Sequence, residues 1–250
     1  HVGGHHEFAD CWCHRLEAPG LRGADPAYTL GDIRVEGANT SLIDATVLTT
    51  ASSGDTAVGV TLAFNTIGWE AQNVLFNSLD ALLGTSIGLA LSRLGLRVSI
   101  SDLSSASQSL AQDMGAGTAG KSAEAVQLVV VCVPPDSSAR VIAEQLDQHP
   151  NATVTDVASV KAQILDDLVE MGADLTRYVG SHPMAGRERG GALAARGDLF
   201  AGRPWVIAAS DQSSSAAVQT VEALALDLGG VLFHFDPVEH DRAVGLVSHV

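Results

Sequence analysis

Residues 82–102 read LLGTSIGLALSRLGLRVSISD and decide the fold class. Gly84 precedes a run with helical spacing of apolar side chains, predicted as a helix over Ile87–Leu94. A short apolar strand, Val98–Ser101, follows and ends at Asp102. A glycine turn, a helix, a strand and an acidic residue in this order are typical of the first unit of a parallel α/β sheet.

Downstream of this unit, apolar strands alternate with helical segments, as in a parallel sheet with helices on its faces. The predicted strands are Leu128–Val133, Thr153–Val157, Tyr178–Gly180, Trp205–Ala208 and Val231–Phe235. The predicted helices are Ser104–Asp113, Ser138–Gln148, Val160–Met171 and Ser215–Leu228, and another begins at Val238. We therefore expect an α/β fold, a Rossmann-like parallel sheet with flanking helices.

The glycine turn suggests dinucleotide binding. A helix N-terminus at Thr85–Ser86 would face a pyrophosphate, and Gly84 would close the turn before it. Asp102 would accept hydrogen bonds from ribose hydroxyls and repel a 2′-phosphate, which favours NAD over NADP. The turn at Val133–Pro134 would shape the nicotinamide side. Leu79 and Ala81 stand where the first two glycines of the usual fingerprint belong, so this motif alone is weak.

The residues Gly84-Thr85-Ser86-Ile87-Gly88 also match the nucleophile elbow of serine hydrolases. In that alternative Ser86 is the nucleophile, and Asp236 and His240 supply the acid and the base. The elbow requires a strand directly before it, and Asp80–Leu83 offers only a short one.

The first part of the chain has a different texture. Residues 1–25 contain a C-x-C-H pattern at Cys11–His14 that matches no familiar zinc spacing, so we expect a loosely ordered terminus and no metal. Residues 26–78 resemble a β-rich segment of unrelated character, with strands near Ile33–Val35, Leu42–Leu48 and Ala57–Phe64. We place the dinucleotide-binding domain at residues 79–250. A non-catalytic surface-protein fragment remains an alternative if residues 26–78 define the chain.

Composition excludes several functions. Asp and Glu number 29 against 14 Lys and Arg, a net charge of −15, which disfavours binding to nucleic acid or to an anionic membrane. Hydrophobic residues make up 46% of the chain, enough for a core, but no apolar run is long enough to cross a membrane. Three cysteines cannot form a disulfide framework. We expect a cytoplasmic protein.

The order of the downstream motifs resembles the prephenate and arogenate dehydrogenase family over residues 82–250. The shared motifs are GTSIGLAL, VSISD, VVVCVPP, DVASVK, GSHPMAG, FAGRPW and HDRAVGLVSH, of which GSHPMAG is the most specific. The resemblance implies oxidative decarboxylation of prephenate to 4-hydroxyphenylpyruvate with NAD(P)⁺, in tyrosine biosynthesis. Arogenate, which differs by one amino group, is the alternative substrate.

The resemblance also implies site residues. The histidine of GSHPMAG is His182, which would accept the proton of the substrate hydroxyl, a role suited to imidazole. Ser159 would orient His182 or the hydroxyl, Lys161 would offer a cation to a carboxylate, and His249 would lie near the substrate. The family continues into a helical dimerising domain beyond Val250, so we expect low turnover from this chain and no dimer through that domain.

Overall fold

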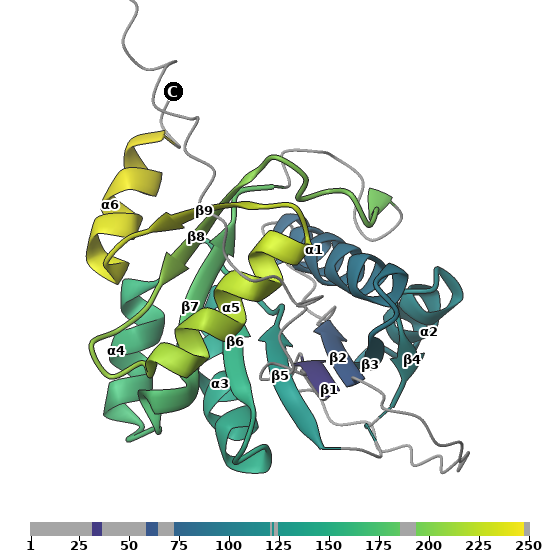
Figure 1. The fold of residues 1–250 in the computed structure, drawn as a ribbon, viewed down its shortest axis with the longest axis horizontal. Helices are drawn as coiled ribbons and strands as arrows, with labels where there is room; N and C mark the ends of the chain where they lie inside the picture. Colours follow the sequence, from purple (N-terminus) through teal and green to yellow (C-terminus); the bar gives the residue numbers. More distant parts are fainter. Residues whose placement is uncertain are drawn as a thin grey trace, which may run out of the picture.

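The computed structural model describes residues 32–36, 59–64, 73–120, 122, 125–185 and 194–247 (Figure 1). In this part of the chain one sheet runs through the molecule in the strand order β1-β3-β2-β5-β6-β7-β8-β9, and the short strand β4 pairs with β3. The strands are β1 Asp32–Glu36, β2 Gly59–Phe64, β3 Arg97–Asp102, β4 Thr118–Ala119, β5 Val126–Val131, β6 Thr153–Asp156, β7 Tyr178–Pro183, β8 Pro204–Ala208 and β9 Val231–His234.

Helices connect these strands. They are α1 Asn73–Arg93, α2 Ser105–Asp113, α3 Pro135–Gln148, α4 Ala162–Glu170, α5 Ser215–Asp227 and α6 Pro237–Val247, with a short 3-10 turn, η1, at Leu175–Arg177. No helix of the described residues is long and apolar enough to cross a membrane. The predicted elements from Val98 onward are confirmed to within a few residues at their ends. The sheet is mixed, however, because β8 runs antiparallel to β7 and β9 runs parallel to β8.

Strand β5 shows why a sheet forms here. Leu128 and Val130 belong to one hydrophobic cluster, with α1 and α5, whereas Val129 and Val131 belong to the other, with α3 and α4. Successive side chains of a strand point to opposite faces, so an unbroken apolar run requires helices on both faces. The fold is thus the α/β sheet with flanking helices that the sequence predicts.

Two strands from the β-rich N-terminal segment, β1 and β2, belong to the same sheet. Both β1 and β2 pair in parallel with β3 and β5, and Ile33 and Val60 are each in register with Val98. Helix α1 crosses the predicted boundary at residue 79. The interpretation of residues 26–78 as a separate β layer is therefore wrong for these two strands, since their hydrogen bonds go to β3 and β5. The predicted strand at Leu42–Leu48 lies outside the described residues.

The prediction that a helix begins at Thr85–Ser86 is wrong. Helix α1 begins at Asn73 and continues through Gly84 to Arg93. Leu82, Ile87 and Leu91 are buried in the core, so the burial of this apolar face outweighs the roughly 1 kcal/mol that an internal glycine costs a helix.

Candidate functional site

The carboxyl ends of β6 and β7 bring two predicted site residues to one edge of the sheet. Asp156 of β6 is in parallel register with Gly180 of β7, so Ser159, three residues further on, and His182, two further on, both lie toward this edge. The Ser159 hydroxyl has no hydrogen-bond partner among the described residues, and the side chain is partly exposed. In open α/β sheets ligands bind at this edge.

His182 is hydrogen-bonded to a second histidine that comes from the helix after β9. Its Nδ1 lies 3.0 Å from Nε2 of His240, and the two rings meet edge to face at 79°, with centroids 5.2 Å apart. His240 is fully buried, while His182 is half-buried. Within the described part of the chain, Nε2 of His182 has no hydrogen-bond partner.

Asp241 anchors this pair to α4. Its Oδ1 is 2.8 Å from His240 Nδ1 and accepts a 2.8 Å hydrogen bond from the backbone N–H of Lys161, and its Oδ2 accepts one of 2.9 Å from Ala162. Lys161 and Ala162 begin α4, whose first N–H groups lack partners within the helix. Asp241 therefore caps α4 and holds α6 beside it, as Figure 1 shows.

Burial and nearby charges keep the two imidazoles neutral. Burial, with the positive charge of Lys161 and the neighbouring His240, lowers the pKa of His182 to about 3, against an opposing effect of Asp241. Burial also lowers the pKa of His240, although the hydrogen bond to Asp241 opposes this. Burial works against ionisation of Asp241, but hydrogen bonds from Ala162, His240 and Lys161 lower its pKa below the usual value. The site thus contains one carboxylate and two neutral rings.

Lys161 is placed differently from its predicted role. Its side chain is 1% exposed, and its ammonium forms an ion pair with Asp156, so it does not face open space where a substrate carboxylate could reach it. Asp156 also accepts hydrogen bonds from the Tyr178 hydroxyl at 2.8 Å and from the Ala158 backbone at 3.0 Å. This buried cluster links β6, β7 and the start of α4 by side-chain contacts.

Asp102, predicted to bind the ribose of a dinucleotide, lies at the carboxyl end of β3. Asp102 ends β3 as predicted, and its Oδ1 accepts a 2.7 Å hydrogen bond from the Ser104 backbone. Its Oδ2 is buried without a hydrogen-bond partner among the described residues. Burial raises the pKa of Asp102 to about 8, despite the hydrogen bond from Ser104. An unpartnered carboxyl oxygen at this strand end fits a ligand that supplies hydroxyl donors.

The turn after β5 also lies where it was expected. Val133 is buried, Pro134 precedes the first turn of α3, and the Ser138 hydroxyl donates to the carbonyls of both residues at 3.3 and 3.1 Å. The connection from β5 to α3 is therefore fixed by side-chain hydrogen bonds at the ligand-binding edge of the sheet.

The predicted pyrophosphate turn is not at Gly84–Ser86. These residues lie inside α1, Thr85 and Ser86 are fully buried, and Ser86 Oγ accepts a 3.2 Å hydrogen bond from the Arg196 backbone. Instead α1 brings Asp80 toward the strand ends, where burial, together with Asp136 and Asp156, raises its pKa to about 7. The connection from β2 to α1, residues 65–72, lies outside the described residues.

The same placement contradicts the serine hydrolase. An elbow requires a strand before the nucleophile, and residues 80–83 are helical. His240 is bonded to His182 and Asp241 and not to Ser86, while Asp236 Oδ1 accepts hydrogen bonds from the Val238 and Glu239 backbones at the start of α6.

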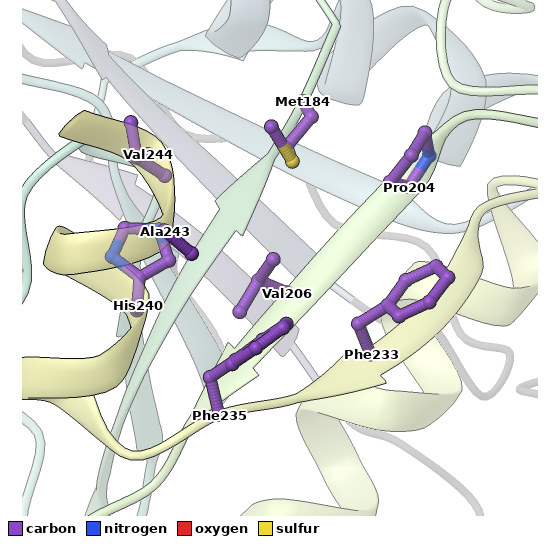
Figure 2. Close-up of a pocket in the computed structure, with 8 residues that line it drawn as sticks. All are labelled: Met184, Pro204, Val206, Phe233, Phe235, His240, Ala243 and Val244. Atoms are coloured by element: carbon purple, nitrogen blue, oxygen red, sulfur yellow. The ribbon is translucent and has the colours of Figure 1, made fainter. Parts of the chain in front are cut away.

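An apolar cavity of about 220 Å³ lies on the His240 side of the histidine pair. Figure 2 shows its walls, with α6 on one side and the aromatic side chains Phe233 and Phe235 on the other. The remaining lining residues come from β8, from α6 and from the residue after β7: Met184, Pro204, Val206, Ala243 and Val244. His240 is the one titratable side chain in this wall.

Some predicted residues lie beyond what can be located. His249 and the C-x-C-H pattern at Cys11–His14 are outside the described residues, and no group of potential metal ligands occurs among the residues that are described. Sequence reasoning did not foresee that His240 and Asp241 join His182. The adjacent His-Asp pair in HDRAVG was a signal, but its partner is 58 residues away in sequence.

Flanking helices on a largely parallel sheet and an acidic residue ending the strand after the first helix are features of nucleotide-binding α/β domains. Residues 87–234 match the family model described as prephenate dehydrogenase, nucleotide-binding domain. The chain therefore belongs to the prephenate dehydrogenase family, a family of NAD-dependent dehydrogenases.

Individual relatives agree with this assignment. The chain is 41% identical over 165 residues to the probable prephenate dehydrogenase NovF of Streptomyces niveus, covering 66% of this chain and 46% of that protein. It is 26% identical over 126 residues to the cyclohexadienyl dehydrogenase of Zymomonas mobilis, covering 49% of this chain and 42% of that protein. The chain thus spans about half the length of these relatives.

A solved structure also matches. The crystal structure of prephenate dehydrogenase from Aquifex aeolicus in complex with hydroxyphenyl propionate and NAD⁺ superposes with a TM-score of 0.59 at 28% identity. The match covers 67% of this chain and 61% of that one.

Proposed function

We propose that this chain is the nucleotide-binding part of a dehydrogenase that oxidises and decarboxylates prephenate with NAD⁺, with His182 as the base. The observation that carries the proposal is a neutral imidazole at the carboxyl end of β7 whose Nε2 has no partner among the described residues. Such a nitrogen can accept a proton from a substrate hydroxyl without first losing one.

The chemistry requires a base at this point. NAD⁺, when bound, supplies the hydride acceptor. Loss of a hydride from the ring carbon that bears the hydroxyl is easier as the hydroxyl proton moves to His182 Nε2. The bond to the ring carboxylate then breaks, CO₂ leaves, and the electron pair makes the ring aromatic. His182 can return its proton to the phenol oxygen, so no proton or electron is left unaccounted for.

Ser159 and Asp102 have supporting roles in this proposal. The Ser159 hydroxyl, which has no hydrogen-bond partner among the described residues, lies at the same sheet edge as His182 and can orient the substrate hydroxyl by a hydrogen bond. Asp102 Oδ2 would accept hydrogen bonds from the adenosine ribose, and its charge once ionised would disfavour a 2′-phosphate, which supports NAD over NADP. Val133 and Pro134 would border the nicotinamide.

Arogenate is the alternative substrate, supported by the Zymomonas mobilis relative, which is named a cyclohexadienyl dehydrogenase. Prephenate and arogenate share the ring and differ in the side chain, so competition between them in one assay distinguishes the two. A cytoplasmic location remains part of the proposal and is supported by the free, buried thiol of Cys132.

Calorimetric titration of NAD⁺ and NADP⁺ into the 250-residue chain tests the nucleotide-binding part. We expect saturable NAD⁺ binding, weaker NADP⁺ binding, and an affinity for NAD⁺ about tenfold lower in Asp102→Ala, the scale of one or two lost hydrogen bonds. His182→Asn should leave NAD⁺ affinity unchanged. Absence of binding by either nucleotide would contradict the proposal for this chain.

The chemical part is tested by prephenate-dependent NADH formation. Because the chain spans about half of its relatives' length, we expect low turnover. Whatever turnover is present should fall by about 100-fold or more in His182→Asn, the range for loss of a general base. An equal loss of NAD⁺ affinity and turnover would show that His182 is structural.

A further inference from the structure

The hydrogen bond between His182 and His240 determines which nitrogen of His182 carries the proton. Neutral imidazole has one N–H and one acceptor nitrogen, and the partner of one nitrogen decides the state of the other. Asp241 Oδ1 lies 2.8 Å from His240 Nδ1. An ionised carboxylate can only accept, so His240 Nδ1 must donate.

The proton position on His240 determines the proton position on His182. With its proton on Nδ1, neutral His240 has an acceptor at Nε2, which lies 3.0 Å from His182 Nδ1. His182 Nδ1 must therefore donate, and its Nε2 is left as an acceptor. The charged and titratable groups that face His182 are Lys161, His240 and Asp241. Lys161 is paired with Asp156, so it does not compete for either ring nitrogen.

We infer that His240 and Asp241 are positioning residues that hold His182 in the Nδ1–H tautomer, which leaves Nε2 as the proton acceptor. As a role in catalysis, the inference rests on the proposed function. The tautomer itself does not, because Asp241 is fixed by two backbone N–H groups of α4 and His240 is buried against it.

The chain of hydrogen bonds has a further physical benefit. When His182 accepts a proton, its Nδ1–H becomes a stronger donor toward His240, and the Asp241 carboxylate stabilises the polarised pair. This compensates part of the cost of placing a charge on a half-buried imidazole. Asp241 thus links the cap of α4, the placement of α6 and the protonation state of a residue on β7.

The test is the tautomer of His182, read at neutral pH from long-range ¹H–¹⁵N correlations in the ¹⁵N-histidine-labelled chain. His182→Asn identifies the His182 signals among the nine histidines. We expect the Nδ1–H pattern in the unsubstituted chain. His240→Phe keeps a ring but removes the acceptor, and should move His182 to the Nε2–H form or to a mixture. His240→Gln places an amide oxygen near the position of Nε2 and should restore the Nδ1–H form.

His234 offers a matched control. Its Nε2 lies 2.7 Å from Glu222 of α5. Phe233, and not His234, is in register through Val206 with His182, so the His234 side chain points to the opposite face of the sheet, and His234→Gln removes a paired histidine from that face. It should leave the His182 signals unchanged. An Nε2–H pattern in the unsubstituted chain, or an Nδ1–H pattern that persists in His240→Phe, would overturn the inference.

Turnover gives the second measurement. His240→Phe should lower kcat for prephenate oxidation by about 100-fold with little change in KM, and His240→Gln should recover most of the loss. The NMR result needs neither nucleotide nor substrate. Failure of NAD⁺ binding therefore contradicts the proposed function alone, whereas failure of the tautomer shift contradicts this inference alone. A purely structural His240 would lower stability without moving the tautomer.

Discussion

The edge at β6 and β7 and the middle of α1 both carry predicted site residues, yet only at the former do some of them, Ser159 and His182, lie where the sequence places them. At β6 and β7, parallel pairing of two apolar strands brings Ser159 and His182 to one edge. In α1, the residues predicted to form a glycine turn are in a helix that starts eleven residues before Gly84. The end of a strand can be located from the residue pattern of the strand itself. The position of the glycine turn depends on where the helix begins, which the residues of the turn do not determine.

The two regions also handle buried polar groups differently. Asp156 is satisfied by Lys161, Tyr178 and the Ala158 backbone. Asp80 in α1 has one oxygen without a partner among the described residues, and its pKa is raised accordingly. The hydrogen bonds and the ion pair of Asp156 favour a single arrangement of the side chains around it. The unpartnered oxygen of Asp80 places no such restriction on the residues near it.

The largest effect we expect is on stability, at the β6–β7 edge. Lys161→Met leaves the Asp156 carboxylate buried without its cation and should cost about 3–5 kcal/mol of unfolding free energy in urea. The double variant Lys161→Met with Asp156→Asn should recover much of this, because both charges are then absent and the amide can still pair with the Tyr178 hydroxyl and the Ala158 backbone. Arg140→Ala, which breaks an exposed pair with Glu144, is the control and should cost less than about 1 kcal/mol. A loss that small in Lys161→Met would mean that the cluster is hydrated.

The next effect tests whether α1 is a helix through Leu82. Leu82 is 1% exposed in the larger hydrophobic cluster, so Leu82→Ala should cost about 2–5 kcal/mol, as for other buried leucines. A turn that faced a nucleotide would lose far less. Leu103→Ala, at a leucine that is 46% exposed, provides the comparison and should stay within about 0.5 kcal/mol. Similar small losses in both variants would favour the glycine turn over the helix.

Much of the fold could be predicted because periodicity reports burial directly. Val98–Ser101, Leu128–Val133 and Thr153–Val157 predict β3, β5 and β6 closely. Leu128–Val133 is an unbroken apolar run, and the other two alternate apolar with polar residues between turns. The pairing of β1 and β2 with β3 was missed, because alternating short strands fit a separate layer equally well. The antiparallel β8 was missed because strand direction leaves no trace in residue pattern.

In the candidate site, too, local features could be predicted from the sequence and contacts between distant residues could not. The placement of His182, Ser159 and Asp102 near the carboxyl ends of strands could be predicted from the pattern of apolar segments, whereas the roles proposed for His182 and Ser159 came from the family resemblance. The burial of Lys161 was not predicted, since a lysine at the start of a helical run looks like any surface cation. The partnership of His182 with His240 depends on the packing of α6 against β7 and α4, which no local pattern encodes.

The last prediction concerns Asp102, at the end of β3, and the dependence of stability on pH. The pKa of Asp102 is about 8 in the folded chain and ordinarily 3.8, so the folded state binds the proton more tightly than the unfolded state. The associated stability is complete below pH 4 and is lost as the pH rises to 8. Asp102→Asn resembles the protonated form and should therefore stabilise the nucleotide-free chain increasingly as the pH rises from 4 to 8.

Thermal unfolding of both proteins between pH 4 and 9 measures this. The Tm difference should be near zero at pH 4 and grow toward pH 8, and Asp113→Asn, at an exposed carboxylate of α2, should show no such trend. Saturating NAD⁺ should reverse the order of the two proteins, because ribose hydroxyls would supply Asp102 Oδ2 with the donors that it lacks among the described residues. An Asp102→Asn variant that is less stable at every pH would show that this carboxylate is already satisfied within the chain.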